Sequence, residues 1–236
     1  MPIPASRPPV HRGNTGMAPI RTAVVTGRHP FDARGFAELF RSLDGIDAYI
    51  QHMEEFTADP GRLRDWYDVV VFYNMHRETP TGKGPWYEKS TKAALERLGE
   101  SDQGMLMLHH AILAFPEWPM WSEIVGIEDR RFGFHIGESI HVEVAKPDHP
   151  ITKGLTAWDT VDETYEMNDA GPGSEVLLTT EHPKSMKTLA WTRQYRNAAV
   201  LCLQPGHDDA GWRSQSFRTV LERGIHWLAG RLPAAD

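Results

Sequence analysis

The segment Tyr67-Asp-Val-Val-Val-Phe-Tyr73 is apolar almost without interruption and rich in β-branched residues. Continuous apolar runs of this kind are typical of strands in a parallel sheet, because helices cover both faces of such a sheet. Two other segments, Gln103-Gly-Met-Leu-Met-Leu108 and Thr22-Ala-Val-Val-Thr26, have the same character, and the second ends at Gly27. We therefore predict that all three are buried strands of one parallel sheet.

Segments with helical periodicity lie between and after these strands. Residues 31–43 carry apolar side chains at positions 36, 39, 40 and 43, which is the spacing of an amphipathic helix. Residues 86–98 and 214–228 have similar apolar stripes, and residues 46–53 are predicted to form a weaker strand. This alternation of strands and helices predicts a doubly wound α/β fold.

Beyond residue 138 the pattern changes to strands in succession. They are predicted at residues 139–145, 160–167, 175–180, 187–195 and 198–204. Such a series is typical of antiparallel hairpins, here added at one end of the parallel sheet. We expect one domain over residues 21–232, preceded by a flexible, proline-rich leader at residues 1–20.

Composition excludes several classes of protein. The 236 residues include 25 Lys+Arg and 32 Asp+Glu, a net charge of −7, which argues against nucleic acid as the main partner. A single cysteine, Cys202, cannot form a disulfide within the chain. Apolar runs fall far short of the ~20 residues that a membrane helix needs, and the first twenty residues lack the apolar core of a signal peptide. We expect a cytoplasmic protein that binds a small polar molecule.

Polar residues follow several of the predicted strands directly. In open α/β sheets, ligands bind at the carboxyl ends of the strands, so these residues are the candidates for a site. They are His29, Asn74, His76, His109, His110, His207 and Asp208. Adjacent residues of a strand point to opposite faces, so we expect one of His109 and His110 to face the crevice, unless the turn rotates both inward, and we leave open which one.

Two further strands carry candidate binding residues. Glu163 and Tyr165 share one face of their predicted strand, and a carboxylate beside a phenol can bind sugar hydroxyls or move protons. Trp191 and Arg193 also share a face and are expected to line a carbohydrate pocket.

No strong metal-binding motif occurs in the sequence. Imidazole and carboxylate groups from distant segments could still assemble a site for zinc or another divalent ion. The candidate ligands are His109 or His110, with His110 preferred, together with Glu163 and His207. The sequence leaves open whether the protein uses a metal cofactor at all.

Seven motifs, in this order and spacing, resemble the ThuA-like family, which is named for trehalose utilisation, over residues 21–230. The motifs are Gly27-Arg-His-Pro-Phe-Asp32, Tyr67-Asp-Val-Val-Val-Phe-Tyr-Asn-Met75, Gly104-Met-Leu-Met-Leu-His-His-Ala111, Asp148-His-Pro-Ile-Thr152, Asp162-Glu-Thr-Tyr165, Ala190-Trp-Thr-Arg193 and Gly206-His-Asp208. The resemblance implies a class I glutamine amidotransferase-like fold, which is a flavodoxin-like three-layer sandwich. It also implies a role in the catabolism of disaccharides or their keto derivatives.

The chain departs from the amidotransferases at the residue that would carry their chemistry. Those enzymes have a cysteine after the strand that here ends at Leu108, whereas this sequence has His109-His110-Ala111. Cys202 lies inside a predicted strand, where a small buried residue is expected. Amidotransferase chemistry through a thiolate is therefore not expected.

The sequence leads to two hypotheses about function. The first is an isomerase or hydrolase of keto-sugars that uses acid/base or metal-assisted chemistry, with the catalytic residues His109, His110, Glu163 and His207. Its substrate-binding residues would be His29, Asn74, Tyr165, Trp191, Arg193 and Asp208. The second is a non-catalytic sugar-binding or regulatory module, and these residues could also simply satisfy one another in a polar core. Homo-oligomers could form through aromatic residues such as Trp118 and Trp121, although a monomer is equally open.

Overall fold

A mixed sheet runs through the whole molecule. In the computed structural model, which describes residues 18–58 and 64–232, nine strands follow the order β2-β1-β3-β4-β9-β8-β7-β5-β6. β1 (Ile20–Gly27) begins one residue before the predicted start of the fold. Most of the predicted leader, residues 1–17, lies outside the described residues.

The first half of the sheet is parallel. Its side chains alternate strictly between two apolar clusters, so that Val24, Leu106 and Leu201 face one side while Val25, Met107 and Cys202 face the other. This double burial explains the continuous apolar runs in the sequence. The strands in this half are β2 (Ile46–His52), β1, β3 (Val69–Asn74), β4 (Gly104–Leu108) and β9 (Ala198–Leu203).

The second half is antiparallel and extends the sheet beyond β9. Each of its strands pairs with its neighbour in antiparallel register, and β6 forms the outer edge. The strands are β8 (Thr188–Tyr195), β7 (Ser174–Thr179), β5 (Gly133–Val144) and β6 (Trp158–Glu166).

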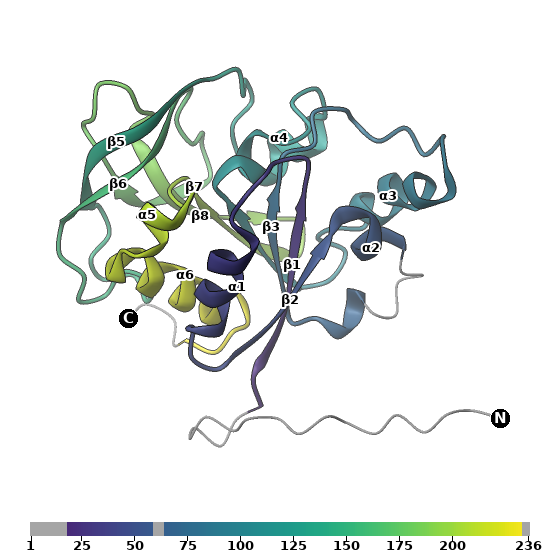
Figure 1. Ribbon diagram of the computed structural model, residues 1–236, viewed down its shortest axis with the longest axis horizontal. Helices are drawn as coiled ribbons and strands as arrows, with labels where there is room; N and C mark the ends of the chain where they lie inside the picture. Colours follow the sequence, from purple (N-terminus) through teal and green to yellow (C-terminus); the bar gives the residue numbers. More distant parts are fainter. Residues whose placement is uncertain (1–17, 59–63, 233–236) are drawn as a thin grey trace.

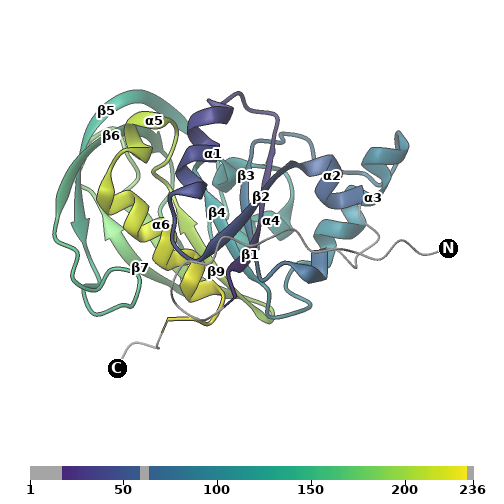
Figure 2. The same ribbon diagram turned by 60° about the horizontal axis from the view of Figure 1, so that its bottom comes forward.

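Helices cover both faces of the sheet (Figures 1 and 2). On one face, α1 (Ala33–Arg41) and α6 (Gln215–Leu228) pack Phe36 and Phe217 into the first cluster. The second cluster, on the other face, includes residues of α2 (Met53–Ala58), α3 (Trp86–Glu96) and α4 (Pro119–Val125). The flavodoxin-like three-layer α/β sandwich predicted from the sequence is confirmed.

The predicted strands are all present. The structure differs from the sequence-based expectations in three respects, of which the first concerns a strand. β5 begins at Gly133 rather than at residue 139, and its added residues include the exposed Phe134 and Ile136. The short helices α2, α4 and α5 (Asp209–Trp212) were not predicted. Trp118 and Trp121 are buried in the chain, so neither side chain is exposed for the self-association considered above.

Candidate functional site

The chain makes a sharp turn at His109, directly after β4. His109 opens a short 3-10 helix (His109–Leu113) and has a φ of 51°, a left-handed conformation that is uncommon for residues other than glycine. The surrounding structure stabilises this strained backbone, and such strain is concentrated at functional sites. Because of the turn, His109 and His110 do not alternate across the sheet as strand residues would. Both side chains are buried at the carboxyl edge of the parallel strands.

Two hydrogen bonds fix the imidazole ring of His109. Its Nδ1 donates to the carbonyl oxygen of Gln204 at 2.5 Å, because a carbonyl can only accept. The second ring nitrogen, Nε2, therefore carries a lone pair when the ring is neutral. The hydroxyl of Tyr165 lies 2.6 Å from it. Burial, and then the charge of Glu163, raise the pKa of Tyr165 well above its usual value, so this hydroxyl keeps its proton and donates.

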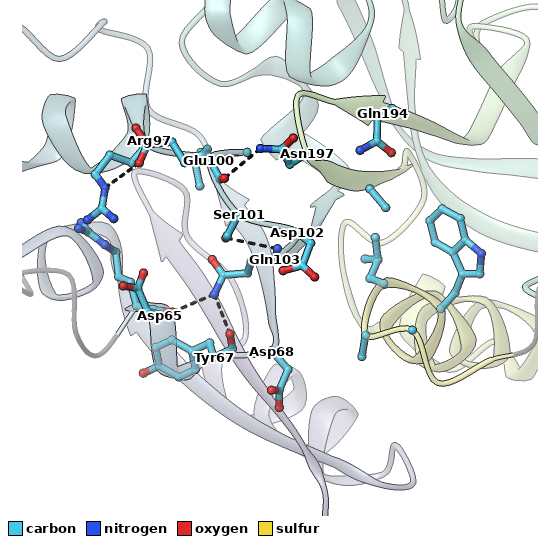
Figure 3. Close-up of a pocket in the computed structure, with 18 of the residues that line it drawn as sticks. Asp65, Tyr67, Asp68, Arg97, Glu100, Ser101, Asp102, Gln103, Gln194 and Asn197 are labelled. Atoms are coloured by element: carbon cyan, nitrogen blue, oxygen red, sulfur yellow. Dashed lines mark hydrogen bonds and ion pairs between the residues drawn. The ribbon is translucent and has the colours of Figure 1, made fainter.

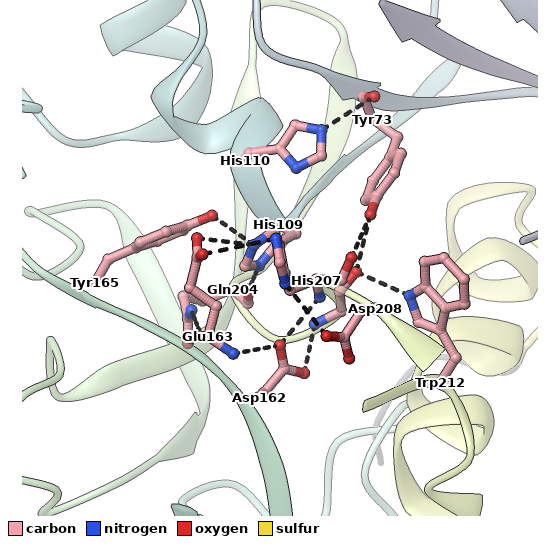
Figure 4. A network of polar contacts seen from close by, with 11 residues as sticks. Tyr73, His109, His110, Asp162, Glu163, Tyr165, Gln204, His207, Asp208 and Trp212 are labelled. Atoms are coloured by element: carbon pink, nitrogen blue, oxygen red, sulfur yellow. Dashed lines mark hydrogen bonds and ion pairs between the residues drawn. The ribbon is translucent and has the colours of Figure 1, made fainter. Parts of the chain in front are cut away.

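Glu163 joins the two histidines of the site (Figure 4). Its Oε1 lies 3.4 Å from His109 Nε2, and its Oε2 lies 3.6 Å from His207 Nε2. Burial alone would raise the pKa of Glu163. Hydrogen bonds and charges from His109, His207 and Tyr165 outweigh burial and lower the pKa below its usual value. Glu163 is therefore an ionised carboxylate beside two imidazoles at neutral pH.

A second acidic residue, Asp162, holds the turn that carries His207. Its carboxylate accepts hydrogen bonds from the backbone N–H groups of Gly206 at 2.8 Å and His207 at 3.0 Å. Burial raises the pKa of Asp162, against the effects of His109 and of these backbone donors. Tyr73 supports the same turn by donating its hydroxyl proton to the carbonyl of His207 at 2.8 Å. Asp162 is thus a positioning residue that the sequence analysis did not select.

His110 lies against a different set of partners. Its ring stacks on His29 with 4.3 Å between centroids, and its Nε2 lies 3.3 Å from the carbonyl oxygen of Tyr73. Burial lowers the pKa of His110, and burial also lowers that of His29. The prediction left open which of the two adjacent histidines faces the centre. The structure places His109 between Glu163 and Gln204, and His110 beside His29.

The remaining residues predicted at strand ends lie around this centre. Asn74 is fully buried, and its amide nitrogen lies 3.3 Å from Nδ1 of His76. Asp208 is half-exposed, lies 3.5 Å from Nδ1 of His207 and caps α5 through a bond from the backbone of Ala210.

Two predicted substrate-binding residues lie away from the centre. Trp191 is completely buried in the cluster under α4, and its indole N–H donates to the carbonyl of Val125 at 2.8 Å. Arg193 donates to the hydroxyl of Ser174 and packs close to Gly126. The prediction that Trp191 and Arg193 line a carbohydrate pocket is therefore corrected, because this face of β8 is covered by α4 and the segment after it.

The described residues include a group that could hold a metal ion at this centre. One ligand atom from each of His109, Glu163 and His207 lies within 4.8 Å of the other two. Tetrahedral zinc with bonds of about 2.1 Å requires ligand atoms about 3.4 Å apart, close to the two contacts of Glu163. His110, the preferred ligand in the sequence analysis, does not belong to this group. An ion would compete with the Tyr165 hydroxyl for the lone pair of His109 Nε2.

A cavity lies at the opposite edge of the sheet (Figure 3). It has a volume of about 810 Å³ and is bounded by segments that precede β3, β4 and β9. Several of its polar side chains support turns: Gln103 donates to the carbonyls of Arg64 and Tyr67, and Asn197 donates to that of Glu100. We place the chemistry at the His109 centre rather than here, because that centre combines two histidines with a carboxylate, whereas no histidine of the described residues lines the cavity.

Acid is expected to destabilise the protein through His76, which stacks on Phe115 near the centre. Burial, and then the positive charge of Arg28, lower the pKa of His76 to about 4. The unfolded chain takes up this proton near pH 6.5, whereas the folded chain does not, so stability is lost as the pH falls from 7 to 4. The loss from His76 is about 3 kcal/mol. Urea unfolding at several pH values measures the free energy of unfolding of the wild type and of His76→Gln. This free energy should fall less steeply with falling pH in His76→Gln. Parallel plots against pH for the two proteins would contradict the role of His76.

The chain has a glutamine amidotransferase-like fold, and a histidine occupies the turn after β4. The family model described as ThuA, trehalose utilisation, matches residues 27–228. The chain belongs to the ThuA family, as its motifs indicated. A comparison with curated proteins found no match.

Solved structures confirm the fold. A ThuA-like protein from Parabacteroides merdae is 20% identical, with a TM-score of 0.70 and 91% of each chain covered. A cytoplasmic protein from Salmonella typhimurium is 13% identical, with a TM-score of 0.60 and coverage of 87% of this chain and 98% of that one. A glutamine amidotransferase from Thermotoga maritima is 12% identical, with a TM-score of 0.51 and coverage of 88% and 98%. In the described part of this chain, no helix is long and apolar enough to cross a membrane.

Proposed function

We propose that this protein is an enzyme that acts on a sugar or keto-sugar by acid/base chemistry at His109, Glu163 and His207. The observation that carries the proposal is the fixed ring of His109, whose Nδ1 is bonded to the carbonyl of Gln204 while Nε2 faces Glu163 and Tyr165. An imidazole held in one tautomer beside a carboxylate is the arrangement of a general base. Membership of a family named for trehalose utilisation supports a sugar as the substrate.

In this mechanism, Nε2 of His109 removes a proton from the carbon next to the carbonyl of a keto-sugar. The negative charge of Glu163, 3.4 Å away, stabilises the imidazolium that forms. His207 is less buried than His109 and lies on the other oxygen of Glu163, so it is placed to give a proton to the carbonyl oxygen. The former carbonyl carbon then takes the first proton back from His109 while the other hydroxyl of the enediol returns a proton to His207, which moves the carbonyl by one carbon and restores both histidines. For hydrolysis, the same base would remove a proton from the attacking water while His207 gives a proton to the oxygen that leaves as the glycosidic bond breaks.

A divalent ion bound by His109, Glu163 and His207 would supply Lewis-acid polarisation of the carbonyl oxygen. The three residues fit such an ion by distance and by ligand type. In that state the hydroxyl of Tyr165 would turn from His109 to Glu163. The ion would change which atom polarises the sugar but not which residues form the centre.

The charges around the centre favour a neutral substrate. Among the described residues, no Lys or Arg forms an ion pair with Glu163 or Asp208, and Asp208 lies 3.5 Å from His207. A phosphate or carboxylate group on the substrate would therefore meet negative charge without a cationic partner. Cytoplasmic location is part of the proposal, supported by two structural neighbours from Salmonella typhimurium that are described as cytoplasmic proteins.

Turnover of a panel of 3-keto-disaccharides, with and without divalent ions, tests this function. We expect Glu163→Gln to reduce turnover at least about 100-fold, because it removes the charge that stabilises the imidazolium. Glu54→Gln is the matched control, since Glu54 belongs to the more exposed group of His52, Glu54 and Glu55. Wild-type turnover in Glu163→Gln would contradict the proposal. Sugar binding without turnover in the wild type would instead favour a non-catalytic binding module.

A further inference from the structure

A buried nitrogen of His110 has no hydrogen-bond partner. The residue is 1% exposed, and its Nδ1 makes no hydrogen bond in the structure. More than 90% of buried backbone polar groups and most buried side-chain polar atoms are paired with protein or ordered water. The unpaired Nδ1 at the carboxyl edge of the sheet is therefore expected to form a hydrogen bond with a bound molecule.

The partner of the other ring nitrogen decides what kind of occupant fits. Nε2 lies 3.3 Å from the carbonyl oxygen of Tyr73, which can only accept, so Nε2 carries the hydrogen. A second proton at Nδ1 would create a buried imidazolium, and no carboxylate lies within ion-pair distance of His110 in the described residues. Burying an unpaired charge is costly. Nδ1 is therefore a bare lone pair that accepts a hydrogen bond and cannot donate one.

The ring of His110 lies beside the acid/base centre. Its centroid is 5.4 Å from that of His109, and Figure 4 shows the second ring nitrogen turned toward His109 and His207. Two more atoms without partners lie at neighbouring strand ends, Nδ1 of His29 and Oδ1 of the fully buried Asn74. The stacked rings of His29 and His110 thus form, with Asn74, a group of neutral polar side chains from three adjacent strands.

We propose that His110 is a positioning residue whose Nδ1 accepts a hydrogen bond from a hydroxyl group of the bound sugar. This inference rests on the proposed function, because it assigns the ligand of the same site. The hydrogen bond from this hydroxyl to Nδ1 orients the sugar ring, so that the carbon next to the one bearing the hydroxyl faces His109. Neutral acceptors of this kind select a hydroxyl over a carbonyl or carboxylate oxygen, which could not donate. His110 therefore distinguishes a sugar carbon that bears a hydroxyl from one that has been oxidised.

A thermodynamic cycle tests this role, in which one change removes the acceptor from the protein and the other removes a hydroxyl from the ligand. Binding of trehalose and its monodeoxy analogues is measured by calorimetry for the wild type and for His110→Phe, which keeps a ring but has no acceptor. We expect one deoxy position to bind about tenfold more weakly to the wild type. The same analogue should bind no more than about twofold more weakly than trehalose to His110→Phe. The control His141→Phe, an exposed histidine on β5, should keep the wild-type pattern.

An equal deoxy penalty in the wild type and His110→Phe would overturn the proposal. Nitrogen-15 NMR of the wild-type imidazoles decides the question even if His110→Phe does not fold. We expect Nδ1 of His110 to be unprotonated in the free protein and to change its chemical shift when trehalose is added. A protonated Nδ1, or no shift because a buried water keeps the position, would overturn it.

A wild type that binds no disaccharide would overturn the proposed function rather than the chemistry of His110. Titration with glycerol, a small neutral polyol, then tests whether His110 accepts a hydroxyl group independently of the proposed function. A shift of the His110 Nδ1 signal with glycerol would support hydroxyl acceptance at this atom. A constant signal would overturn it.

Discussion

Replacing His109 by glutamine is expected to lower kcat by about 10²- to 10⁴-fold, the usual contribution of a general base. His109 is the only residue whose ring nitrogen contacts both Glu163 and Tyr165 in the described structure, so no neighbour is placed to remove the same proton. Glutamine is polar and can still pair with the carbonyl of Gln204, which limits the effect on folding. The KM should change much less than kcat, because the lost interaction belongs to the transition state.

Non-additivity distinguishes this role from a structural one. If His109 and Glu163 act as one unit, His109→Gln combined with Glu163→Gln should lose little more activity than either single variant. Steady-state kinetics on the best keto-sugar substrate measures the cycle, with circular dichroism as the check of folding. Losses that multiply in the double variant, or a single variant within threefold of the wild type, would contradict the assignment.

Replacing Arg130 by methionine is expected to reduce the free energy of unfolding by about 3–5 kcal/mol, in the range for breaking a buried charged network. Arg130 is 3% exposed, and it forms no ion pair with a carboxylate of residues 18–58 or 64–232. Its guanidinium donates instead to the carbonyls of Ile112, Ala114, Phe115 and Pro116 and to the hydroxyl of Ser122. Burial, and then the positive charge of Arg77, lower its pKa to about 10, so the group stays charged at neutral pH.

The adjacent arginine provides a matched control. Arg131 is exposed and pairs only with Asp129, and such surface pairs contribute between about 0 and 1 kcal/mol. Urea unfolding of Arg130→Met and Arg131→Met should therefore differ by several kcal/mol. The carbonyls that Arg130 holds follow the turn at His109, so turnover should also fall in Arg130→Met. Similar stabilities for the two variants would contradict this role.

Much of the fold follows from the apolar pattern of the sequence. Runs such as residues 67–73 identify a strand because both faces of each parallel strand are buried. A continuous apolar run is therefore the pattern that such a strand requires. The start of β5 is not readable, because Phe134 and Ile136 are apolar and yet exposed. Helices as short as α2, α4 and α5 span too few residues to display a period. Their positions follow from tertiary packing, as with Trp121 of α4 beneath the sheet.

The candidate site was predictable in part, from the positions of polar residues relative to the strand ends rather than from the apolar pattern. Glu163 and His207 were found because polar residues near strand ends converge in this class of fold. Alternation could not assign His109 and His110, since the left-handed turn at His109 changes the direction of both side chains. Asp162 and Gln204 were missed because their contacts in the site involve backbone groups, which leave no pattern in the sequence. Trp191 was misassigned because sequence does not reveal which strand faces a helix covers.

The histidine after β4 gives the main contrast with the amidotransferases. Cys202 is buried in β9, and burial raises the pKa of its thiol, so a thiolate nucleophile is not available there. The turn instead presents an imidazole nitrogen to a carboxylate and a phenol. Under the proposed function, the same backbone architecture would support proton transfer in place of covalent catalysis.

A crystal structure of Glu163→Gln soaked with a 3-keto-disaccharide tests the central claim most directly, because the variant is expected to bind the sugar without converting it. The account predicts sugar density within hydrogen-bond distance, about 3.2 Å, of His109 Nε2 and His207 Nε2. Density in the cavity at the amino edge of the sheet, with none at the His109 centre, would contradict it.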